Sequence, residues 1–213
     1  MSVKNLFIAF EGIDGSGKST QVKLLAEFLT HKGHKVYTTF EPTDSRIGVM
    51  IRDIFNHRME GDQRVIAALF AADRLNHLLN SQDGILKKLK EGYTVITDRY
   101  YFSSYAYHSV HNIDMDWVIQ ANSMSADLLR PDLNIYIDIS PDVSMERLKK
   151  GRNSFEMYET LENQKMVYDK YKEAFDRLGD AEKVFVTDGN RKTDLIAEDI
   201  RIAVEALIGP GNN

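Results

Sequence analysis

Three glycines, a lysine and three hydroxyl side chains stand together at residues 12–20, where the sequence reads GIDGSGKST. The pattern G-x-x-x-x-G-K-[ST] here follows an apolar run and precedes an apolar-periodic segment, the context in which such a loop cradles a phosphate chain. Backbone N–H groups and the positive end of the next helix would face the phosphates, and the glycines would let the backbone approach them closely. The sequence therefore predicts a nucleoside-triphosphate site.

The residues of this loop have distinct expected parts. Lys18 would reach the terminal phosphates, and the Ser19 hydroxyl would coordinate Mg²⁺. A glycine-rich turn without a ligand is the alternative, but the complete pattern in this context rarely arises by chance. The residues expected to bind ATP here are Gly12, Ile13, Asp14, Gly15, Ser16, Gly17, Lys18, Ser19 and Thr20.

A second stretch, TVITDRY at residues 94–100, ends an apolar run on an acid followed at once by a cation. Asp98 would join Ser19 in the Mg²⁺ shell, and Arg99 would bind a second phosphate through its forked guanidinium. A regulatory GTPase would need N-K-x-D and D-x-x-G elements after its strands, whereas the strand ends here read DRYY, DISP and DGNR. The acid and the cation together favour a kinase whose acceptor already carries a phosphate.

Short apolar runs alternate with longer helical patterns along the chain, as in parallel α/β proteins. The run from Val65 to Leu79 predicts a largely buried helix, and Ser140-Pro141 predicts a helix start. The chain is expected to close on an amphipathic helix that includes residues 196–207. Near-continuous apolar or β-branched runs predict strands buried on both faces at 6–10, 36–40, 94–97, 133–139 and 184–187.

Composition favours an ordinary soluble globular protein, with 43% hydrophobic and 28% charged residues among 213. The absence of cysteine excludes disulfides, thiolate metal sites and cysteine nucleophiles. A net charge of −5 argues against bulk affinity for nucleic acid, and no apolar run approaches membrane-spanning length. We expect a cytoplasmic protein with one domain over residues 1–213 and no nucleic-acid or membrane partner.

Four spaced pieces of the sequence resemble the thymidylate kinases, which are P-loop nucleoside-monophosphate kinases. They read FEGIDGSGKST, LFAADR at 69–74, DRYYFSS at 98–104 and RPDLNIYIDISP at 130–141. FEMYE at 155–159 is similar to that family's E-R-Y-E lid element. The resemblance implies a five-stranded parallel sheet flanked by helices, a short lid at about residues 147–159 and a homodimer. It also implies a reaction in which Mg·ATP and dTMP give ADP and dTDP.

The resemblance further implies a role for individual residues. Phe70 would stack on the thymine ring, and Arg74 would hydrogen-bond its O4. Arg99 and Arg52 would clamp the 5′-phosphate, and Asp14 would hold the 3′-hydroxyl. Tyr158 and Gln164 would close over the nucleotide from the lid side, and Arg147 would lie against adenine. The implied substrate-binding set is Asp14, Glu41, Arg52, Phe70, Arg74, Arg99, Ser103, Tyr107, Tyr158 and Gln164.

Several of these residues also have a plainer interpretation. Phe70 lies in an apolar helical stripe and could be a core residue, and Arg52 could be a solvated helix charge. Arg74 follows one turn after Phe70 and would not be buried without a partner. The segment HSVHNIDMDW at 108–117 has two histidines near carboxylates, yet a zinc site needs more convergent ligands. We interpret it as a loop leading into a helix that carries Trp117.

The chemistry can be argued from the acceptor itself. A phosphate with a second pKa of about 6 is already anionic at neutral pH, so it needs no side-chain base. Catalysis is then mostly positioning and neutralisation of charge, with Lys18, Asp98 and Arg99 as catalytic residues. The loop has Gly15 where some relatives place an arginine, so a further cation is expected from the lid. Arg152, with Lys150 as the alternate, is the expected source.

Two other functions remain open from the sequence. Met157 departs from the lid pattern, and Thr43 stands where some relatives carry a phosphate-binding arginine. Glu41 in FEPTDSRIG also resembles the glutamate that deoxynucleoside kinases use as a base toward a 5′-hydroxyl, so a thymidine-type nucleoside kinase is the main alternative. A catalytically idle ATP-binding protein is the other, although the set Lys18, Ser19, Asp98 and Arg99 is intact.

Overall fold

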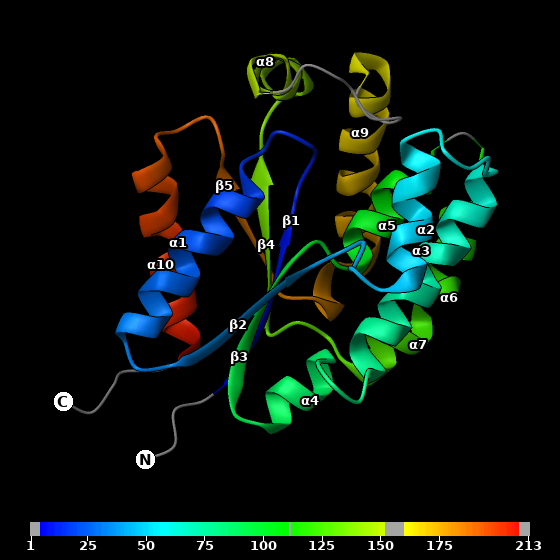
Figure 1. Cartoon of the computed structure of the whole chain (residues 1–213). Coiled ribbons are helices and arrows are strands. Elements are labelled where there is room, and N and C mark those ends of the chain that lie inside the picture. The colour runs from blue at the N-terminus through cyan, green and yellow to red at the C-terminus, as the bar shows by residue number, and fades with distance from the viewer. Residues whose placement is uncertain (1–4, 111, 152–159, 209–213) are drawn as a thin grey trace.

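A five-stranded parallel sheet with the order β2-β3-β1-β4-β5 forms the centre of the computed structural model, which describes residues 5–110, 112–151 and 160–208 (Figure 1). All five predicted strands are confirmed, each within one residue of its expected bounds. The observed strands are β1 (Phe7–Glu11), β2 (Lys35–Phe40), β3 (Tyr93–Asp98), β4 (Leu133–Asp138) and β5 (Val184–Asp188). The α/β fold with a P-loop, expected from the sequence, is therefore correct.

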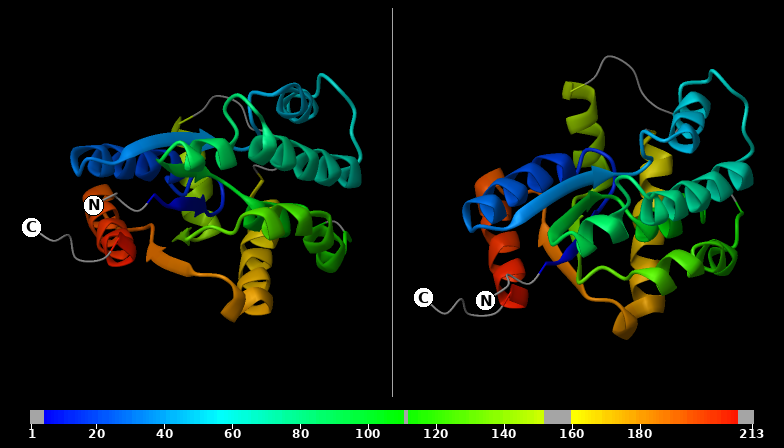
Figure 2. Two further views of the ribbon diagram at one scale, coloured as in Figure 1. Left: turned by 90° about the horizontal axis from the view of Figure 1, so that it is seen from below. Right: turned by 60° about the horizontal axis from the view of Figure 1, so that its bottom comes forward.

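Successive side chains of β1 point to opposite faces of the sheet and enter two different apolar clusters. Ile8 and Phe10 pack with α1 (Lys18–His31) and α10 (Thr193–Ile208), whereas Phe7 and Ala9 belong to a cluster that includes residues of α5 (Tyr101–Tyr107) and α9 (Leu161–Leu178). Figure 2 shows α1 and α10 together on one side of the sheet, with α9 on the other. Burial on both faces explains the apolar runs of β1, β3 and β4. The same expectation is wrong for β2 and β5, which are the edge strands of the sheet and leave Phe40 and Val186 45% and 55% exposed.

The helices follow the predicted pattern. The apolar run at 65–79 lies within α3 (Gln63–Leu79), and α8 (Pro141–Gly151) begins at the predicted Ser140-Pro141 site. Trp117 lies in α6 (Met115–Ala121), as expected. None of the helices in the described ranges is long and apolar enough to cross a membrane. The remaining helices are α2 (Arg46–Phe55), α4 (Ile85–Lys90), α7 (Ser123–Leu128) and the 3₁₀ turn η1 (Gly179–Ala181).

The carboxyl ends of all five parallel strands lie along one edge of the sheet, toward the top in Figure 1. Phe10 of β1 pairs with Asp98 of β3, so the loop after β1 and the DR pair after β3 leave the sheet side by side. Glu41 follows β2 on the other side of β3. Ligands of open α/β sheets bind at this edge, and the predicted site residues gather there.

Candidate active site

The loop between β1 and α1 has a backbone that only glycine adopts easily. Gly12, Gly15 and Gly17 have φ of 141°, 74° and 98°, in the left-handed region that side chains disfavour. A Cβ on Gly12 would also lie 2.8 Å from the carbonyl oxygen of Ile137 on β4. The loop can therefore lie tightly against the sheet where it leads into α1.

Lys18 is the first residue of α1 and its side chain folds back over the loop. Its Nζ donates to the carbonyl oxygens of Gly12 and Ile13 at 3.0 and 3.1 Å. Burial and then Arg99 lower the pKa of Lys18 to about 8, although Asp98 and Asp14 oppose the decrease. An ammonium held in this way can exchange its carbonyl partners for phosphate oxygens at little cost in desolvation.

Ser19 and Asp98 meet across the gap between α1 and β3. The Ser19 hydroxyl donates to Oδ2 of Asp98 at 2.6 Å. A hydroxyl beside a carboxylate is a set of hard oxygen donors, which Mg²⁺ prefers, and it lies next to the loop that would hold the phosphates. The two residues predicted for the metal are thus adjacent. No group of three or more His, Cys, Asp or Glu side chains elsewhere in the described ranges could hold a metal ion.

Asp14 forms hydrogen bonds with three other predicted site residues. One of its carboxylate oxygens accepts from Arg99, and the other accepts from the Tyr107 hydroxyl at 2.9 Å and from Nε2 of Gln164 at 3.2 Å. Burial alone would raise the pKa of Asp14, but Arg99 and then Lys18 outweigh burial and lower it. The pocket therefore holds a permanent carboxylate beside a permanent guanidinium.

Arg99 itself is fixed on several sides. Its Nη1 donates to the hydroxyl of Ser103 at 3.0 Å, and its ring partner is Tyr107, 4.7 Å from the guanidinium carbon. Burial lowers the pKa of Arg99, but Tyr107 and then Asp14 raise it well above its ordinary value. Ser103, Tyr107 and Asp14 thus surround one cation close to the loop.

Glu11, the last residue of β1, is a fully buried acid that the sequence analysis did not assign to the site. Its carboxylate accepts from the Ser103 hydroxyl at 2.6 Å, from the Tyr171 hydroxyl at 3.0 Å and from the backbone N–H of Tyr100 at 3.0 Å. Burial raises the pKa of Glu11 to about 7, against the lowering effects of Ser103 and then Arg99. A charge that interrupts a buried strand needs a partner, and this signal was available in the sequence.

Arg74 is fully buried and its partners belong to the protein. It forms a 2.5 Å ion pair with Glu41 and donates to Ser104 at 2.9 Å and to Asn122. Burial lowers the pKa of Arg74, but Glu41 and then Tyr100, together with Glu11, raise it above its ordinary value. The second oxygen of Glu41 lies 3.1 Å from Nδ1 of His77. The expectation that a buried Arg74 needs a partner is confirmed, and Glu41 is that partner.

Phe70 packs on the ring of His108, with 4.8 Å between ring centroids, and on Phe55 at 6.0 Å. It also belongs to an apolar cluster with Ile51 and Ile54 of α2, which gives it the character of a core residue. Burial and then Arg74 lower the pKa of His108 to about 3, so its imidazole is neutral. Among the described residues, Nδ1 of His108 and Nε of Arg74 have no hydrogen-bond partner.

The remaining predicted residues lie around this centre. Arg52 donates to the carbonyl oxygens of Pro42 and Thr43, both at 2.8 Å, so it is not a freely solvated helix charge. Arg147 donates to the Gly189 carbonyl oxygen at 2.8 Å, after β5. Lys150 is exposed and pairs with Glu146 at 2.6 Å. Arg152 and Tyr158 lie outside the described residues, as does most of the expected lid.

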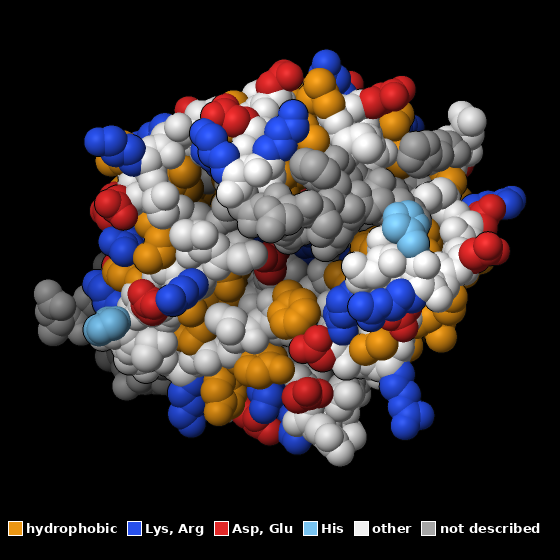
Figure 3. Space-filling model, turned by 45° about the horizontal axis from the view of Figure 1, so that its top comes forward, with side chains coloured by type: hydrophobic (Ala, Val, Ile, Leu, Met, Phe, Trp, Pro, Cys, Tyr) orange, Lys and Arg blue, Asp and Glu red, His pale blue; other side chains and the backbone are white. Residues whose placement is uncertain are grey.

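A cavity of about 470 Å³ brings the donor and acceptor candidates together. Figure 3 shows this end of the molecule, where the surface is hollowed and basic side chains lie to either side. Phe40 and Leu148 line the cavity and were missed by the sequence analysis, since nothing in their types marks them as functional. The lining consists of Asp14, Gly15, Gly17, Lys18, Ser19, Thr20, Phe40, Glu41, Asp98, Arg99 and Leu148.

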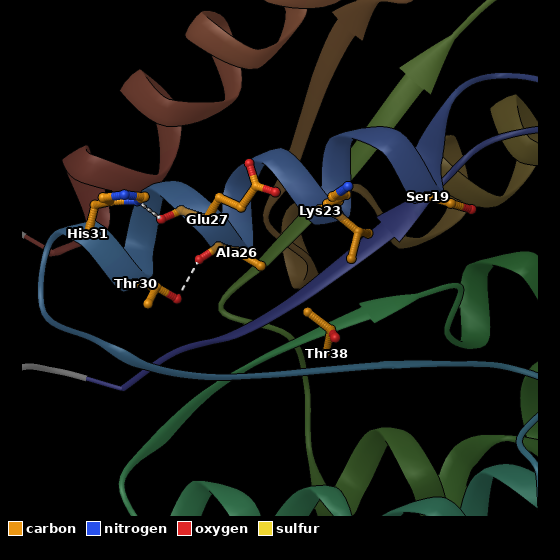
Figure 4. Close-up of a pocket in the computed structure, with 8 residues that line it drawn as sticks. Ser19, Lys23, Ala26, Glu27, Thr30, His31 and Thr38 are labelled. Carbon is orange, nitrogen blue, oxygen red and sulfur yellow. Dashed lines mark hydrogen bonds between the residues drawn. The ribbon is translucent and has the colours of Figure 1, made fainter.

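A second cavity, of about 450 Å³, begins at Ser19 and follows α1 toward His31 (Figure 4). Lys23, Glu27 and Thr38 lie along it. The hydroxyl of Thr30 donates a hydrogen bond to the carbonyl oxygen of Ala26 at 2.7 Å. Apart from Ser19, none of the predicted site residues lines it. The predicted site residues therefore gather around the first cavity.

This chain is a P-loop nucleotide-binding protein by its strand order and its glycine loop. The cluster of Lys18, Asp98 and Arg99 beside that loop agrees with this class. Residues 10–200 match the family model described as Thymidylate kinase. The chain is 42% identical to a probable thymidylate kinase of Pyrococcus horikoshii over 174 residues, which are 79% of this chain and 82% of the relative. A probable thymidylate kinase of Staphylothermus marinus is 35% identical over 98% of this chain and 100% of its own length. A thymidylate kinase of Caldicellulosiruptor saccharolyticus is 38% identical over 80% and 83%. The chain belongs to the thymidylate kinase family.

Proposed function

We propose that this chain transfers the terminal phosphoryl group of ATP to dTMP, giving ADP and dTDP. The observation that carries the proposal is the position of Arg99, which is joined to Asp14 within one cavity that also holds Lys18. The loop and Lys18 bind the donor phosphates, and Arg99 binds the acceptor phosphate opposite them. Relatives named thymidylate kinase support dTMP as the acceptor.

Mg²⁺ fits the pair formed by Ser19 and Asp98, whose oxygens are 2.6 Å apart beside the loop. When bound there, the ion would neutralise charge on the donor phosphates. Lys18 contributes a second positive charge on the same side, and Arg99 contributes a third on the acceptor side. Because the acceptor phosphate is an anionic nucleophile, it needs no residue that removes a proton. These residues have to position the two phosphate groups and neutralise their charge.

The edge of thymine is complementary to the two unpartnered atoms beside Phe70. Nε of Arg74 is a donor that suits the O4 acceptor, and Nδ1 of neutral His108 suits the N3–H donor in the tautomer that leaves Nδ1 unprotonated. Cytosine presents the opposite order, a donor and then an acceptor, and would leave both atoms mismatched. We propose that Phe70 stacks on the base while Arg74 and His108 recognise this edge.

Glu41 is poorly suited to the nucleoside-kinase alternative. One of its oxygens is held in the ion pair with Arg74, and the other faces His77. A general base must be free to take up a proton from the substrate, and both oxygens of Glu41 are already engaged. A phosphate acceptor needs no such base, so the monophosphate reaction is favoured.

A homodimer is the proposed assembly, through the uncovered face of α3. The structure accounts for part of the apolar density at 67–79 within one chain, because Phe70 and Leu78 are buried. Val65 and Leu79 nevertheless remain 49% and 57% exposed on the opposite face. A symmetric partner would cover this face, and sedimentation at micromolar concentration should give twice 24.4 kDa. A sedimenting species of 24.4 kDa would contradict the dimer.

The proposed function is tested by ADP release with Mg·ATP in the presence and absence of dTMP. We expect release that depends on dTMP and that Lys18→Ala abolishes. An idle ATP-binding protein would bind ATP and show the same low release in both conditions. That result would contradict the proposal.

A further inference from the structure

Glu11 lies behind the site, where neither substrate can reach it. It is the last residue of β1, its side chain is fully buried, and it does not line the cavity. The proposed phosphoryl transfer assigns no catalytic or binding role to Glu11. A buried carboxylate is nevertheless costly, and it is retained only where hydrogen-bond donors or cations are fixed around it.

Two of the three donors to Glu11 lead to one residue, Arg99. The Ser103 hydroxyl that donates to Glu11 at 2.6 Å accepts in turn from Nη1 of Arg99 at 3.0 Å. The Tyr100 N–H that donates to Glu11 at 3.0 Å belongs to the peptide bond directly after Arg99. Glu11 thus holds both the guanidinium and the backbone of Arg99.

The backbone of Arg99 requires such support. Its φ of 74° lies in the left-handed region, which is unfavourable for a residue with a long side chain. The N–H of Arg99 donates to the carbonyl oxygen of Phe10 at 2.9 Å, immediately before Glu11, and its own carbonyl oxygen accepts from the Thr97 hydroxyl at 2.9 Å. This conformation directs the side chain back toward the loop and Asp14.

We infer that Glu11 is a positioning residue for the acceptor phosphate, acting through Ser103 and the Tyr100 N–H on Arg99. The inference rests on the proposed function, in which Arg99 binds that phosphate. The negative charge of Glu11 complements the guanidinium of Arg99. Because the carboxylate lies behind the guanidinium, Glu11 does not compete with the substrate phosphate for it. Tyr171 completes the arrangement, because its hydroxyl lies 3.0 Å from Glu11 and 2.8 Å from Ser103.

Glu11→Gln is the most informative change. The amide oxygen can still accept from the Tyr100 N–H, but the amide nitrogen is a donor where two hydroxyls previously donated, and the negative charge is lost. We expect kcat/KM for dTMP to fall roughly 10–100-fold, because a displacement of about 1 Å in a positioning group can cost on the order of 10²-fold. KM for ATP should stay within about twofold of the parent value.

Glu182 supplies a matched control. Its side chain is only 3% exposed and accepts from Arg130 and the Tyr101 hydroxyl, both at 2.7 Å, but it does not line the active-site cavity. Glu182→Gln removes the same charge from a buried, hydrogen-bonded glutamate. If loss of a buried charge acts only through stability, both variants should lower the unfolding midpoint and neither should alter KM for dTMP.

Ser103→Ala keeps the inference testable if Glu11→Gln does not fold, because it cuts the bridge to Arg99 and leaves Glu11 in place. It should raise KM for dTMP more than KM for ATP. The two changes should also be non-additive in kcat/KM, since they interrupt one path. Additive losses, or losses that are equal for dTMP and ATP, would overturn the inference.

Arg99→Lys separates this inference from the function on which it rests. If Arg99→Lys leaves KM and kcat for dTMP unchanged, the assignment of Arg99 to the acceptor phosphate fails. If Arg99→Lys impairs dTMP turnover while Glu11→Gln and Ser103→Ala both match Glu182→Gln, the function stands and the role of Glu11 is refuted.

Discussion

Replacement of Arg74 by methionine should test how far this residue serves the fold. Arg74→Met keeps much of the length of the side chain but leaves Glu41 without its cation, where the side chains are 0% and 1% exposed. Removing one partner of a buried ion pair typically costs about 3–5 kcal/mol, because the other charge stays buried. His77 still faces Glu41 at 3.1 Å, which favours the lower part of this range.

This loss is large beside the stability of an ordinary protein, which is about 5–15 kcal/mol. For a chain of this size it corresponds to a decrease of roughly 6–20 °C in the thermal midpoint. Adding Glu41→Gln to Arg74→Met should restore roughly 1–3 kcal/mol, since the isolated charge is then gone. The free energy of unfolding is measured by urea titration with circular dichroism.

Arg64 supplies the matched control on the same helix. It pairs with Asp62 at 2.8 Å, but its side chain is 75% exposed. Exposed pairs contribute little, so Arg64→Met should leave the urea midpoint almost unchanged. An Arg74→Met protein as stable as Arg64→Met would refute the view that the pair with Glu41 supports the fold, and would return Arg74 to a role in substrate binding alone.

Three further outcomes are expected. The pKa of Glu11 is raised to about 7 in the folded state, so its carboxylate should destabilise the protein as the pH rises. Between about pH 4.5 and pH 8, the free energy of unfolding should fall by up to about 3 kcal/mol relative to Glu11→Gln, measured by urea unfolding. A difference in free energy between the two proteins that does not change with pH would contradict this. Arg152→Ala should lower kcat by on the order of 10³-fold with dTMP binding nearly intact. Lys150→Ala should have a smaller effect, because Lys150 pairs with Glu146. Equal single-turnover rates for Arg152→Ala and the parent protein would exclude Arg152 as the catalytic cation of the lid. His108→Phe should lower kcat/KM for dTMP by about tenfold or more and spare KM for ATP, and equal losses would indicate a role in folding.

The positions of the site residues along the fold could be predicted from the sequence. Lys18, Asp98 and Arg99 follow apolar runs that must be parallel strands, and parallel strands end at one edge. Their mutual contacts could not be predicted in the same way. Arg99 reaches Asp14 because its backbone adopts a left-handed conformation, which a sequence pattern does not specify for arginine.

The partner of Arg74 could not be predicted from the sequence either. The place of Arg74 in an apolar stripe indicates that it needs a partner, but that partner is 33 residues away on the segment after β2. Only the folded chain, which places α3 beside the segment after β2, brings Glu41 to it. Lys150 differs, since its partner Glu146 is one helical turn away and the pair could have been found from the spacing of charges.

The choice of acceptor is the central claim and has a direct test. Initial rates of ADP release with Mg·ATP are compared for dTMP, dUMP, dGMP and thymidine at equal concentrations. Since Arg99 offers a site for a phosphate and Glu41 is engaged by Arg74, we expect turnover with dTMP and almost none with thymidine. A higher kcat/KM for thymidine than for dTMP would contradict the account.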